Sequence, residues 1–223
     1  MDAGPNYEHQ EDGKASCACA TKHPACRLVV VTGGPGAGKT ALLELVRSHF
    51  CHHVAVLPEA AGIIFGGGFP RHRSGAGQRA SQRAIFRVQV ELERLVLDEG
   101  RAAIALCDRG TLDGLAYWPG DAASYWADLG STKERELARY AAVIHLRTPR
   151  PEDYNHDNPL RVESAREAAA VDERITAAWS GHPRIHNVAQ TPDFLDKVAR
   201  GLQLIRDEIP PCCRAQELSV SAR

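Results

Sequence analysis

A glycine-rich stretch near the start of the chain constrains the fold more than any other feature of the sequence. Residues 27–40 read RLVVVTGGPGAGKT and contain the pattern G-x-x-x-x-G-K-[ST], which begins at Gly33 and ends at Thr40. An apolar run, Leu28–Val31, precedes the glycines, and a segment of helical character, Ala41–Phe50, follows them. The pattern is informative where a strand leads into it and a helix leads out of it, which is the order predicted here. The stretch therefore predicts a strand, a tight loop and a helix within an α/β fold.

The residue types in the loop indicate its chemistry. Glycines let the backbone turn so that several N–H groups converge on one phosphate, and the helix that follows adds the partial positive charge of its N-terminus. Lys39 has the length to reach the β- and γ-phosphates of ATP or GTP, and the Thr40 hydroxyl is placed to hold Mg²⁺. An ordinary glycine-rich turn before a helix is the alternative. The residues predicted to contact the nucleotide are Gly33, Gly34, Pro35, Gly36, Ala37, Gly38, Lys39, Thr40 and Ala41.

The composition argues against binding to nucleic acid or to a membrane. The chain has 223 residues, of which 43% are hydrophobic and 25% charged, and its formal net charge is −1. This balance leaves no strong electrostatic attraction to either polyanionic surface, and no apolar run approaches the roughly 20 residues that span a bilayer. The first residues, MDAGPNYEHQEDGK, are polar and acidic, unlike a secretory signal. Seven cysteines, an odd number, indicate reduced thiols and a cytoplasmic protein.

Apolar runs that alternate with helical patterns predict one domain over residues 26–210. Five runs are candidate strands, at Leu28–Val31, His53–Pro58, Ala102–Cys107, Ala142–Leu146 and Arg184–Val188. Their continuous hydrophobicity fits strands buried on both faces of a parallel sheet. Helices are predicted at Ala41–Phe50, Ser81–Glu99, Thr111–Trp118, Ala122–Leu129, Thr132–Ala141, Leu160–Trp179 and Pro192–Ile209. The domain is therefore expected to be a parallel sheet covered by helices on both sides.

Both ends of the chain are predicted to lie outside this domain. Residues 1–25 lack hydrophobic periodicity and are expected to be a disordered tail, and residues 211–223 a second tail. The first tail and its boundary contain Cys17, Cys19, His23 and Cys26. Their spacing, C-x-C-x₃-H-x₂-C, lacks the paired C-x₂-C knuckles of zinc modules, which argues against a metal site there. Cys212 and Cys213 are interpreted as incidental thiols.

The segment after the second predicted strand is rich in glycine and arginine. Gly62–Gln78 is expected to be a mobile, positively charged loop. In the helix predicted after it, Gln82, Phe86 and Gln89 follow helical spacing and could present an amide and aromatic surface to a flat base. Core packing is the alternative for Phe86.

Acidic residues follow two of the predicted strands. Asp108 follows Ala102–Cys107, and Glu59 follows His53–Pro58. An acidic residue beyond the carboxyl end of a central strand is the usual second partner of Mg²⁺ beside a phosphate-binding loop. Helix capping is the alternative role of each carboxylate. Arg109 follows Asp108 at the position where hydrolytic ATPases commonly carry a glutamate, which favours a phosphotransferase.

Several motifs together resemble one group of P-loop proteins. The motifs are GGPGAGKT at 33–40, PEAA at 58–61, DRGTLD at 108–113, AY at 116–117, NPLRVES at 158–164 and HPRIHNVAQTPDFLDK at 182–197. This set resembles the NadR-like group, whose members are often labelled AAA-type ATPases. The group is similar to nicotinamide riboside kinase domains and, more distantly, to thymidylate and deoxynucleoside kinases. The resemblance, which covers about residues 27–209, implies a three-layer α/β/α P-loop NTPase with five parallel strands in the order 2-3-1-4-5 and a helical lid over about residues 155–180.

The resemblance also implies roles for individual residues. Glu59 matches a carboxylate that accepts the proton of the acceptor hydroxyl, and Asp108 and Arg109 match the pair that holds Mg²⁺ and the phosphates or acceptor. Arg161 matches a lid arginine that closes over the transferred phosphoryl group, with Arg166 assisting. Such a lid would neutralise charge and exclude water. Solvated helix charges paired with nearby glutamates are the alternative for both arginines.

The function predicted from the sequence is transfer of the γ-phosphoryl group of ATP or GTP to a hydroxyl of a small molecule. The catalytic residues of this prediction are Lys39, Glu59, Asp108, Arg109 and Arg161, and its Mg²⁺ ligands are Thr40 and Asp108. The acceptor is expected to be nucleoside- or riboside-like, and the insertion Gly62–Gln82 stands where the acceptor pocket of the group begins. An NTP-dependent binding switch or slow ATPase with no acceptor is the alternative.

Overall fold

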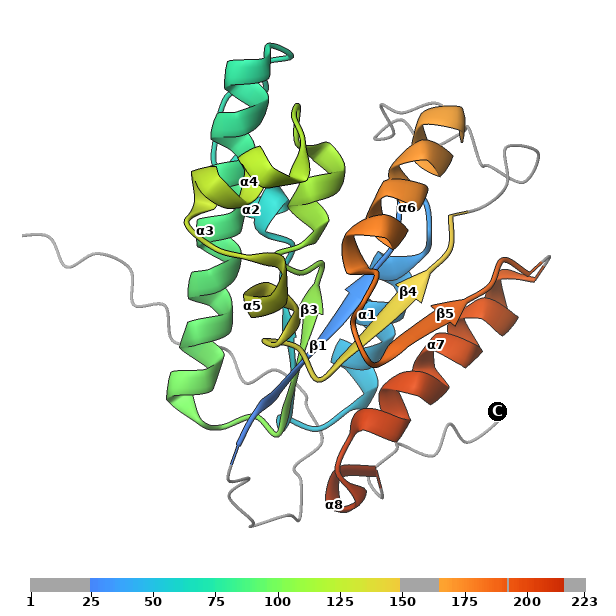
Figure 1. Ribbon diagram of the computed structural model, residues 1–223. Coiled ribbons are helices and arrows are strands. Elements are labelled where there is room, and N and C mark those ends of the chain that lie inside the picture. The colour runs from blue at the N-terminus through green and yellow to red at the C-terminus, as the bar shows by residue number, and fades with distance from the viewer. Residues whose placement is uncertain (1–24, 149–164, 192, 215–223) are drawn as a thin grey trace, which may run out of the picture.

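The computed structural model describes residues 25–148, 165–191 and 193–214, in which strands and helices alternate (Figure 1). The strands are β1 (Arg27–Thr32), β2 (Val54–Leu57), β3 (Ile104–Asp108), β4 (Ala142–Leu146) and β5 (Ile185–Val188). The helices are α1 (Lys39–His49), α2 (Ala60–Gly66), α3 (Gly75–Glu99), the 3₁₀ helix η1 (Asp113–Tyr117), α4 (Ala122–Leu129), α5 (Lys133–Leu137), α6 (Ala165–Trp179), α7 (Phe194–Glu208) and α8 (Pro211–Arg214). Every strand predicted from an apolar run is present.

The strands form one parallel sheet in the order β2-β3-β1-β4-β5, which confirms the predicted order. Strand β1 pairs with β3 from Arg27↔Ile104 to Val31↔Asp108 and with β4 on its other side. Because the strands are parallel, their carboxyl ends meet at one edge of the sheet. The loop that leaves β1 therefore lies between the ends of β3 and β4, where open α/β sheets bind their ligands.

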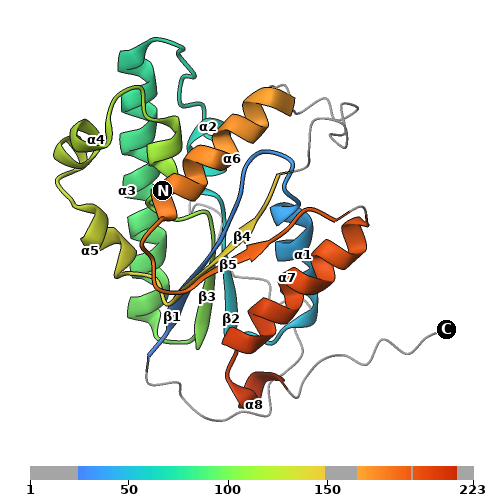
Figure 2. The ribbon, with the colours of Figure 1, turned by 45° about the vertical axis from the view of Figure 1, so that its right-hand side comes forward.

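Successive side chains of β1 enter two separate hydrophobic cores. Val29 and Val31 pack with residues of α1 and α7 on one face of the sheet. Leu28 and Val30 pack with residues of α3 and α6 on the other face. Figure 2 shows these two helical layers on either side of the strands. The arrangement confirms the three-layer prediction and explains why the strand sequences are apolar without alternation.

The glycine- and arginine-rich loop is much shorter than predicted. Helix α2 ends at Gly66 and α3 begins at Gly75, so only the short connection between them is non-helical. Ser74 caps α3, and its hydroxyl accepts a hydrogen bond from the Gly77 N–H at 3.2 Å. A serine cap offsets part of the low helix propensity of glycines in the first turn. The prediction of a loop over Gly62–Gln78 is therefore wrong, because the cap starts the helix before the apolar periodicity begins.

The face of α3 that was considered for binding a base belongs to the core. Phe86 is 4% exposed and packs with Trp118, Tyr125 and Leu129. Gln89 is also buried, and its amide donates a hydrogen bond of 2.8 Å to a buried glutamate of the same helix. Core packing, the alternative for Phe86, is therefore what the structure contains.

The folded chain continues past residue 210, where the second tail was expected to begin. Residues 211–214 form α8, and the Cys213 side chain is buried in the core that contains α1 and α7. The Arg214 Nε atom donates to the Ile209 carbonyl at 2.7 Å, which holds this turn against the end of α7. A buried thiol thus gives the short helix an apolar anchor. Residues 1–24 and 215–223, with Cys17, Cys19 and His23, lie outside the described residues.

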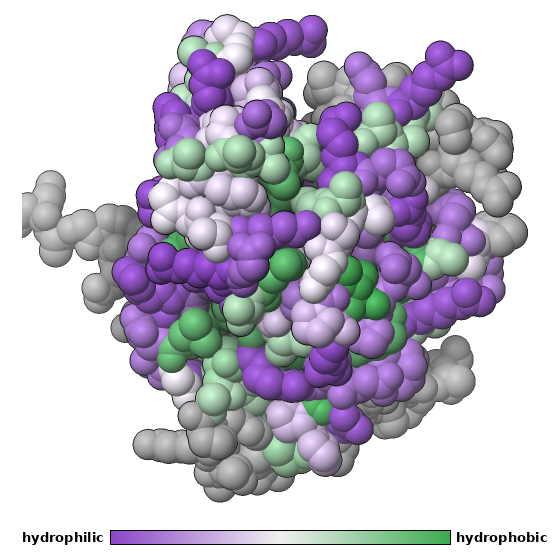
Figure 3. All heavy atoms as spheres, viewed as in Figure 1, coloured by the Kyte–Doolittle hydropathy of each residue, from purple (hydrophilic) through white to green (hydrophobic). Residues whose placement is uncertain are grey.

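No helix within the described ranges combines the length and the apolar character needed to cross a bilayer. The face drawn in Figure 3 mixes hydrophilic residues with small hydrophobic areas. The large apolar side chains that are exposed come from α1, α2, α3 and α7, and are Leu45, Ile63, Leu95, Leu97, Phe194 and Leu195. Some exposed apolar side chains are ordinary on the surface of a globular protein.

Candidate functional site

The glycine loop joins β1 to α1 at the carboxyl edge of the sheet. Gly33, Gly36 and Gly38 have φ angles of 142°, 75° and 96°, which side chains other than glycine rarely adopt. A Cβ at Gly33 would also lie 2.1 Å from the Leu146 carbonyl oxygen, so the site has no room for one. Gly38 is the N-cap residue of α1, and the first turn of that helix contains no acidic side chain. The amides and partial positive charge at this helix end therefore suit an anion.

Lys39, the first residue of α1, folds back over the loop. Its Nζ atom donates to the carbonyl oxygens of Gly33 at 2.9 Å and Gly34 at 3.3 Å. Burial and the nearby Arg109 guanidinium lower the pKa of Lys39 to about 8, although neighbouring carboxylates partly offset them. The lysine that was predicted to neutralise phosphate charge is therefore held at the loop, in surroundings that disfavour its charged form.

Asp108 ends β3 beside the loop, and its Oδ1 atom is buried with no hydrogen-bond partner among the described residues. Burial raises the pKa of Asp108, although the Lys39 charge opposes this shift. A buried carboxylate oxygen without a donor costs free energy unless an ion or ligand satisfies it. Thr40, in the first turn of α1, is an exposed residue. A carboxylate and a hydroxyl are the hard oxygen donors that Mg²⁺ prefers, so these residues fit the ion.

Glu59 and Arg109 connect the ends of β2 and β3. The Arg109 Nε atom donates to Glu59 Oε1 at 2.7 Å, and its NH1 atom donates to the Gly33 carbonyl at 3.2 Å. Glu59 is the N-cap residue of α2, but its side chain makes no capping hydrogen bond. Burial raises the pKa of Glu59, but the charge and hydrogen bond of Arg109, together with the charges of Lys39 and Arg71, outweigh burial, so the pKa lies below the usual value. The Glu59 carboxylate is therefore directed to the arginine and not to the helix.

Arg109 has a strained backbone. Its φ angle is 71°, and it is the one non-glycine residue of the described chain with a positive φ. Its N–H donates to the Val31 carbonyl at 3.1 Å, across the β1–β3 pair. Strained positions of this kind persist where the surroundings hold them, and they cluster at binding and catalytic sites. This conformation turns the arginine side chain toward the loop and Glu59.

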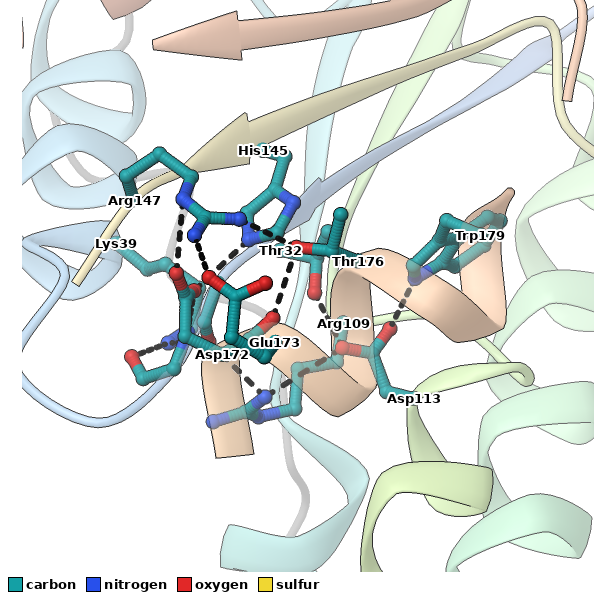
Figure 4. A network of polar contacts seen from close by, with 12 residues as sticks. Thr32, Lys39, Arg109, Asp113, His145, Arg147, Asp172, Glu173, Thr176 and Trp179 are labelled. Atoms are coloured by element: carbon teal, nitrogen blue, oxygen red, sulfur yellow. Dashed lines mark hydrogen bonds and ion pairs between the residues drawn. The ribbon is translucent and has the colours of Figure 1, made fainter. Parts of the chain in front are cut away.

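Asp113, on η1, accepts several hydrogen bonds that hold the strained turn in place. Its Oδ2 atom accepts from the Gly110 N–H at 2.9 Å and from Trp179 Nε1 at 3.2 Å. Its Oδ1 atom accepts from the Thr32 hydroxyl and lies 3.5 Å from the Arg109 NH1 atom. Figure 4 shows the carboxylate between these side chains. Asp113 lies in the DRGTLD motif, which was its only signal in the sequence, and no role had been predicted for it.

A second buried carboxylate, Asp172 of α6, holds the opposite side of the loop (Figure 4). Its Oδ1 atom accepts from the Gly34 N–H at 2.9 Å and lies 2.9 Å from His145 Nε2. Its Oδ2 atom lies 3.1 Å from the Arg147 Nε atom. Burial raises the pKa of Asp172, but the hydrogen bonds with His145 and Gly34 and the charges of His145 and Arg147 together outweigh burial, so the pKa lies below the usual value. Sequence reasoning missed Asp172, because nothing in a helical pattern marks a partner 138 residues away.

Comparison with known proteins agrees with this geometry. A family model described as an AAA domain matches residues 28–193, which is most of the chain and runs from β1 to the residue before α7. The chain belongs to this AAA domain family. The AAA domain is a P-loop NTPase domain, which implies that it binds a nucleoside triphosphate. No curated protein matches the sequence significantly.

The AAA domain also resembles a solved nucleotide kinase in structure. The crystal structure of thymidylate kinase from Ehrlichia chaffeensis superposes with a TM-score of 0.53 and 14% sequence identity, covering 82% of this chain and 99% of that chain. At this level of identity the similarity concerns the fold. The predicted kinase-like P-loop fold is thus confirmed.

The lid predicted for the AAA domain is only partly described. Arg161 and the rest of residues 149–164 lie outside the described residues. Helix α6, which covers the remainder, is built into the core: Val171, Ile175 and Trp179 are buried in the cluster that contains β1. Arg166 is exposed in the first turn of α6. Residues 165–179 are therefore a core helix, tied to the loop through Asp172.

Proposed function

We propose that this AAA domain is a phosphotransferase that moves the γ-phosphoryl group of ATP or GTP to a hydroxyl of a small acceptor. The observation that carries the proposal is an accessible carboxylate at the carboxyl edge of the sheet: Glu59, at the end of β2, lies with its Oε1 atom 2.7 Å from the Nε atom of Arg109. A carboxylate near the triphosphate would repel the phosphates, so we expect Glu59 to act on a different ligand, the acceptor. The Glu59 side chain is 39% exposed, so an acceptor can reach it.

In the proposed reaction the acceptor oxygen attacks the γ-phosphorus, and the bond from phosphorus to the bridging oxygen of the nucleoside diphosphate breaks. The diphosphate leaves with that electron pair, and the hydroxyl proton passes to Glu59 and then to solvent. The lowered pKa of Glu59 makes it a weak base. That suits a loose transition state, in which orienting the hydroxyl matters more than early removal of its proton. Lys39 and Arg109 would neutralise charge on the phosphates, with Arg161 as the proposed lid arginine.

The proposed Mg²⁺ ligands are Thr40 and Asp108. When bound there, the ion would neutralise charge on the β- and γ-phosphates. The unpaired Oδ1 atom of Asp108 supports this assignment. The proposal of a nucleoside- or riboside-like acceptor rests on the resemblance to the NadR-like group and to nicotinamide riboside kinase domains.

One observation favours the second candidate, a binding switch or slow ATPase without an acceptor. Glu59 is already paired with Arg109, and this ion pair needs no acceptor to satisfy it. In a switch, loss of the γ-phosphate would be sensed through Arg109, which contacts both Glu59 and the Gly33 carbonyl of the loop. The two candidates therefore differ in what the Glu59 carboxylate does.

The test is to measure ADP release with a panel of nucleosides and ribosides for the wild type and for Glu59→Gln. For a kinase, one acceptor stimulates release, and the variant retains ATP affinity while stimulated turnover falls by about 10²- to 10⁴-fold. Glu91→Gln, which changes an exposed glutamate of α3, is the matched control and should behave as the wild type. A low rate that no acceptor stimulates, unchanged in Glu59→Gln, would favour the switch.

A further inference from the structure

A cluster of two cysteines and one histidine lies far from the glycine loop. Cys51 follows α1, His53 precedes β2 and Cys213 belongs to α8, and all three side chains are buried. The 11 residues of α1 rise about 1.5 Å each, so about 16 Å separates the loop end of that helix from the end next to Cys51. In Figure 2 the loop between β1 and α1 lies above the sheet and α8 lies below it. The proposed phosphoryl transfer uses none of these residues.

The spacing of the side chains matches a tetrahedral metal site. One nitrogen or sulfur atom from each residue lies within 4.8 Å of the other two. Cys213 Sγ lies 3.6 Å from His53 Nδ1, and the neighbouring Cys212 Sγ lies 3.9 Å from Cys213 Sγ. Tetrahedral Zn²⁺ has Zn–S bonds of about 2.3 Å and Zn–N bonds of about 2.0 Å, which puts sulfur and nitrogen about 3.6 Å apart and two sulfurs about 3.8 Å apart. The two observed separations are close to these sulfur–nitrogen and sulfur–sulfur distances.

The turn that carries two of the ligands is held in place by its backbone. The Val54 N–H donates to the Cys51 carbonyl at 3.0 Å, which closes the turn between α1 and β2. The His53 carbonyl accepts from the N–H groups of Ala103 at 2.8 Å and Ile104 at 3.2 Å, at the start of β3. The two side chains are therefore presented by the edge of the sheet itself, which lowers the entropy lost when a ligand binds.

The third ligand comes from a helix too short to be stable alone. Helix α8 has four residues, and isolated helices shorter than about 12 residues are marginal in water. The Cys213 N–H donates to the Pro210 carbonyl at 2.9 Å, so this turn is formed locally and its side chain points into the core. A bond from Cys213 to an ion shared with the α1–β2 turn would fasten the end of the described chain to the domain.

We propose that Cys51, His53 and Cys213 form a structural zinc site, with Cys212 supplying the fourth ligand. Thiolate and imidazole are soft or borderline donors that select Zn²⁺ over the Mg²⁺ suited to Thr40 and Asp108. Cys212 is exposed, and its sulfur already lies 3.9 Å from the Cys213 sulfur, which makes it the candidate for the fourth position. The site couples folding of α8 to metal and leaves the nucleotide edge of the sheet unaltered.

The test begins with the metal content of the full-length protein purified without chelators, by elemental analysis, and with Co²⁺ substitution. The wild type is expected to hold one Zn²⁺ per chain. After Co²⁺ substitution its absorption spectrum should show the intense bands of tetrahedral Co²⁺ and of thiolate bound to Co²⁺. Cys51→Ala and Cys213→Ala should lose the metal and these bands, and chelation should lower the wild-type melting temperature. Cys212→Ala should keep a metal but lose part of the thiolate band. Cys107→Ala is the matched control, a buried thiol of β3 outside the cluster, and should keep the metal.

Three results would overturn the proposal. The first is a folded wild type, shown by circular dichroism, that holds no zinc and gives no Co²⁺ bands; the thiols would then be core packing. The second is metal that remains in Cys213→Ala and disappears in a Cys17→Ala/Cys19→Ala double variant. The third is a Cys51–Cys213 disulfide in protein isolated without reductant, detected by peptide mass spectrometry. If a cluster variant fails to fold, the spectrum of Co²⁺ bound to the wild type still decides whether thiolates are ligands.

Discussion

The Asp172 carboxylate accepts a hydrogen bond of 2.9 Å from the Gly34 N–H, so a residue of α6 holds the glycine loop in place. The same carboxylate faces His145 and Arg147 of the β4 end, which makes it the junction between the loop, the sheet and a core helix. Buried carboxylates with several donors are rigid, and removing one leaves each donor unsatisfied.

Asp172→Ala should destabilise the domain and weaken nucleotide binding together. The substitution leaves the Gly34 N–H, His145 and Arg147 without their shared acceptor. Breaking a buried pair of this kind costs about 3 kcal/mol or more, which corresponds to a fall in Tm of about 10 °C for a chain of this length. Thermal unfolding and calorimetric titration with Mg·ATP would measure the two effects.

Glu173→Ala is the matched control for that substitution. Glu173 also contacts Arg147, but its side chain is 67% exposed. An exposed ion pair contributes about 0–1 kcal/mol, so the Tm and ATP affinity of Glu173→Ala should stay close to those of the wild type. Equal effects of the two substitutions would show that Arg147, and not the loop contact, is what matters.

Lys39→Ala should strongly weaken Mg·ATP binding and leave the fold intact. The amine contacts two carbonyls of the loop, and it is the flexible cation expected at the β- and γ-phosphates. Calorimetry with ATP provides the measurement, and Arg47→Ala, an exposed position on the same helix, is the control. An unchanged affinity in Lys39→Ala would remove the loop from the nucleotide site.

The affinity for ATP should fall as pH rises above about 8. In the free protein burial and Arg109 lower the pKa of Lys39 to about 8. Bound phosphates would favour the charged amine and so raise its pKa in the complex. From about pH 8 upward the complex therefore binds more protons than the protein without ATP. The affinity for ATP then falls by as much as tenfold per pH unit. Below about pH 7 the amine is protonated in both states, and this dependence vanishes.

Lys39→Arg tests the assignment of that pH dependence. A guanidinium remains charged throughout this range, so the variant should bind ATP with a flat profile between pH 7 and pH 9. Lys197 also has a pKa lowered by burial to about 8. A pH dependence that persists in Lys39→Arg would contradict the assignment to Lys39 and point to Lys197.

Asp108→Asn should raise the Tm of the ligand-free domain and abolish the effect of Mg²⁺ on ATP affinity. The environment disfavours the charged carboxylate, since burial raises its pKa. An amide removes that penalty but is a poorer ligand for a hard cation. Melting curves without ligand and titrations with and without Mg²⁺ would test both parts. A lower Tm would contradict the unfavourable burial of the Asp108 carboxylate. An Mg²⁺ effect equal to that of the wild type would argue against Asp108 as the metal ligand.

Local patterns were sufficient for much of the fold. The loop from Gly33 to Thr40 was predictable because its glycines, which take positive φ angles, and its lysine belong to a short, contiguous pattern. The strands were predictable because burial on both faces requires an unbroken apolar run. The start of α3 was missed, since the Ser74 cap and helix begin within glycines that favour a loop.

At the candidate site, too, some features followed from local patterns and others did not. Asp108 and Glu59 were found because the ends of parallel strands meet at one edge, which the order of elements already implies. Glu59 pairs with Arg109 and does not cap α2. This pairing depends on the strained backbone of Arg109, which could not be predicted from the residue types.

The sequence by itself determined the loop, the strand order and the chemistry available at the carboxyl edge of the sheet. Only the tertiary structure decided which polar groups are buried together. Thr32 meets Asp113 over 81 residues, Gly34 meets Asp172 over 138, and His53 meets Cys213 over 160. The physical reason is that burial of a polar group depends on what packs around it, whereas helical and strand patterns report only which face of an element is apolar.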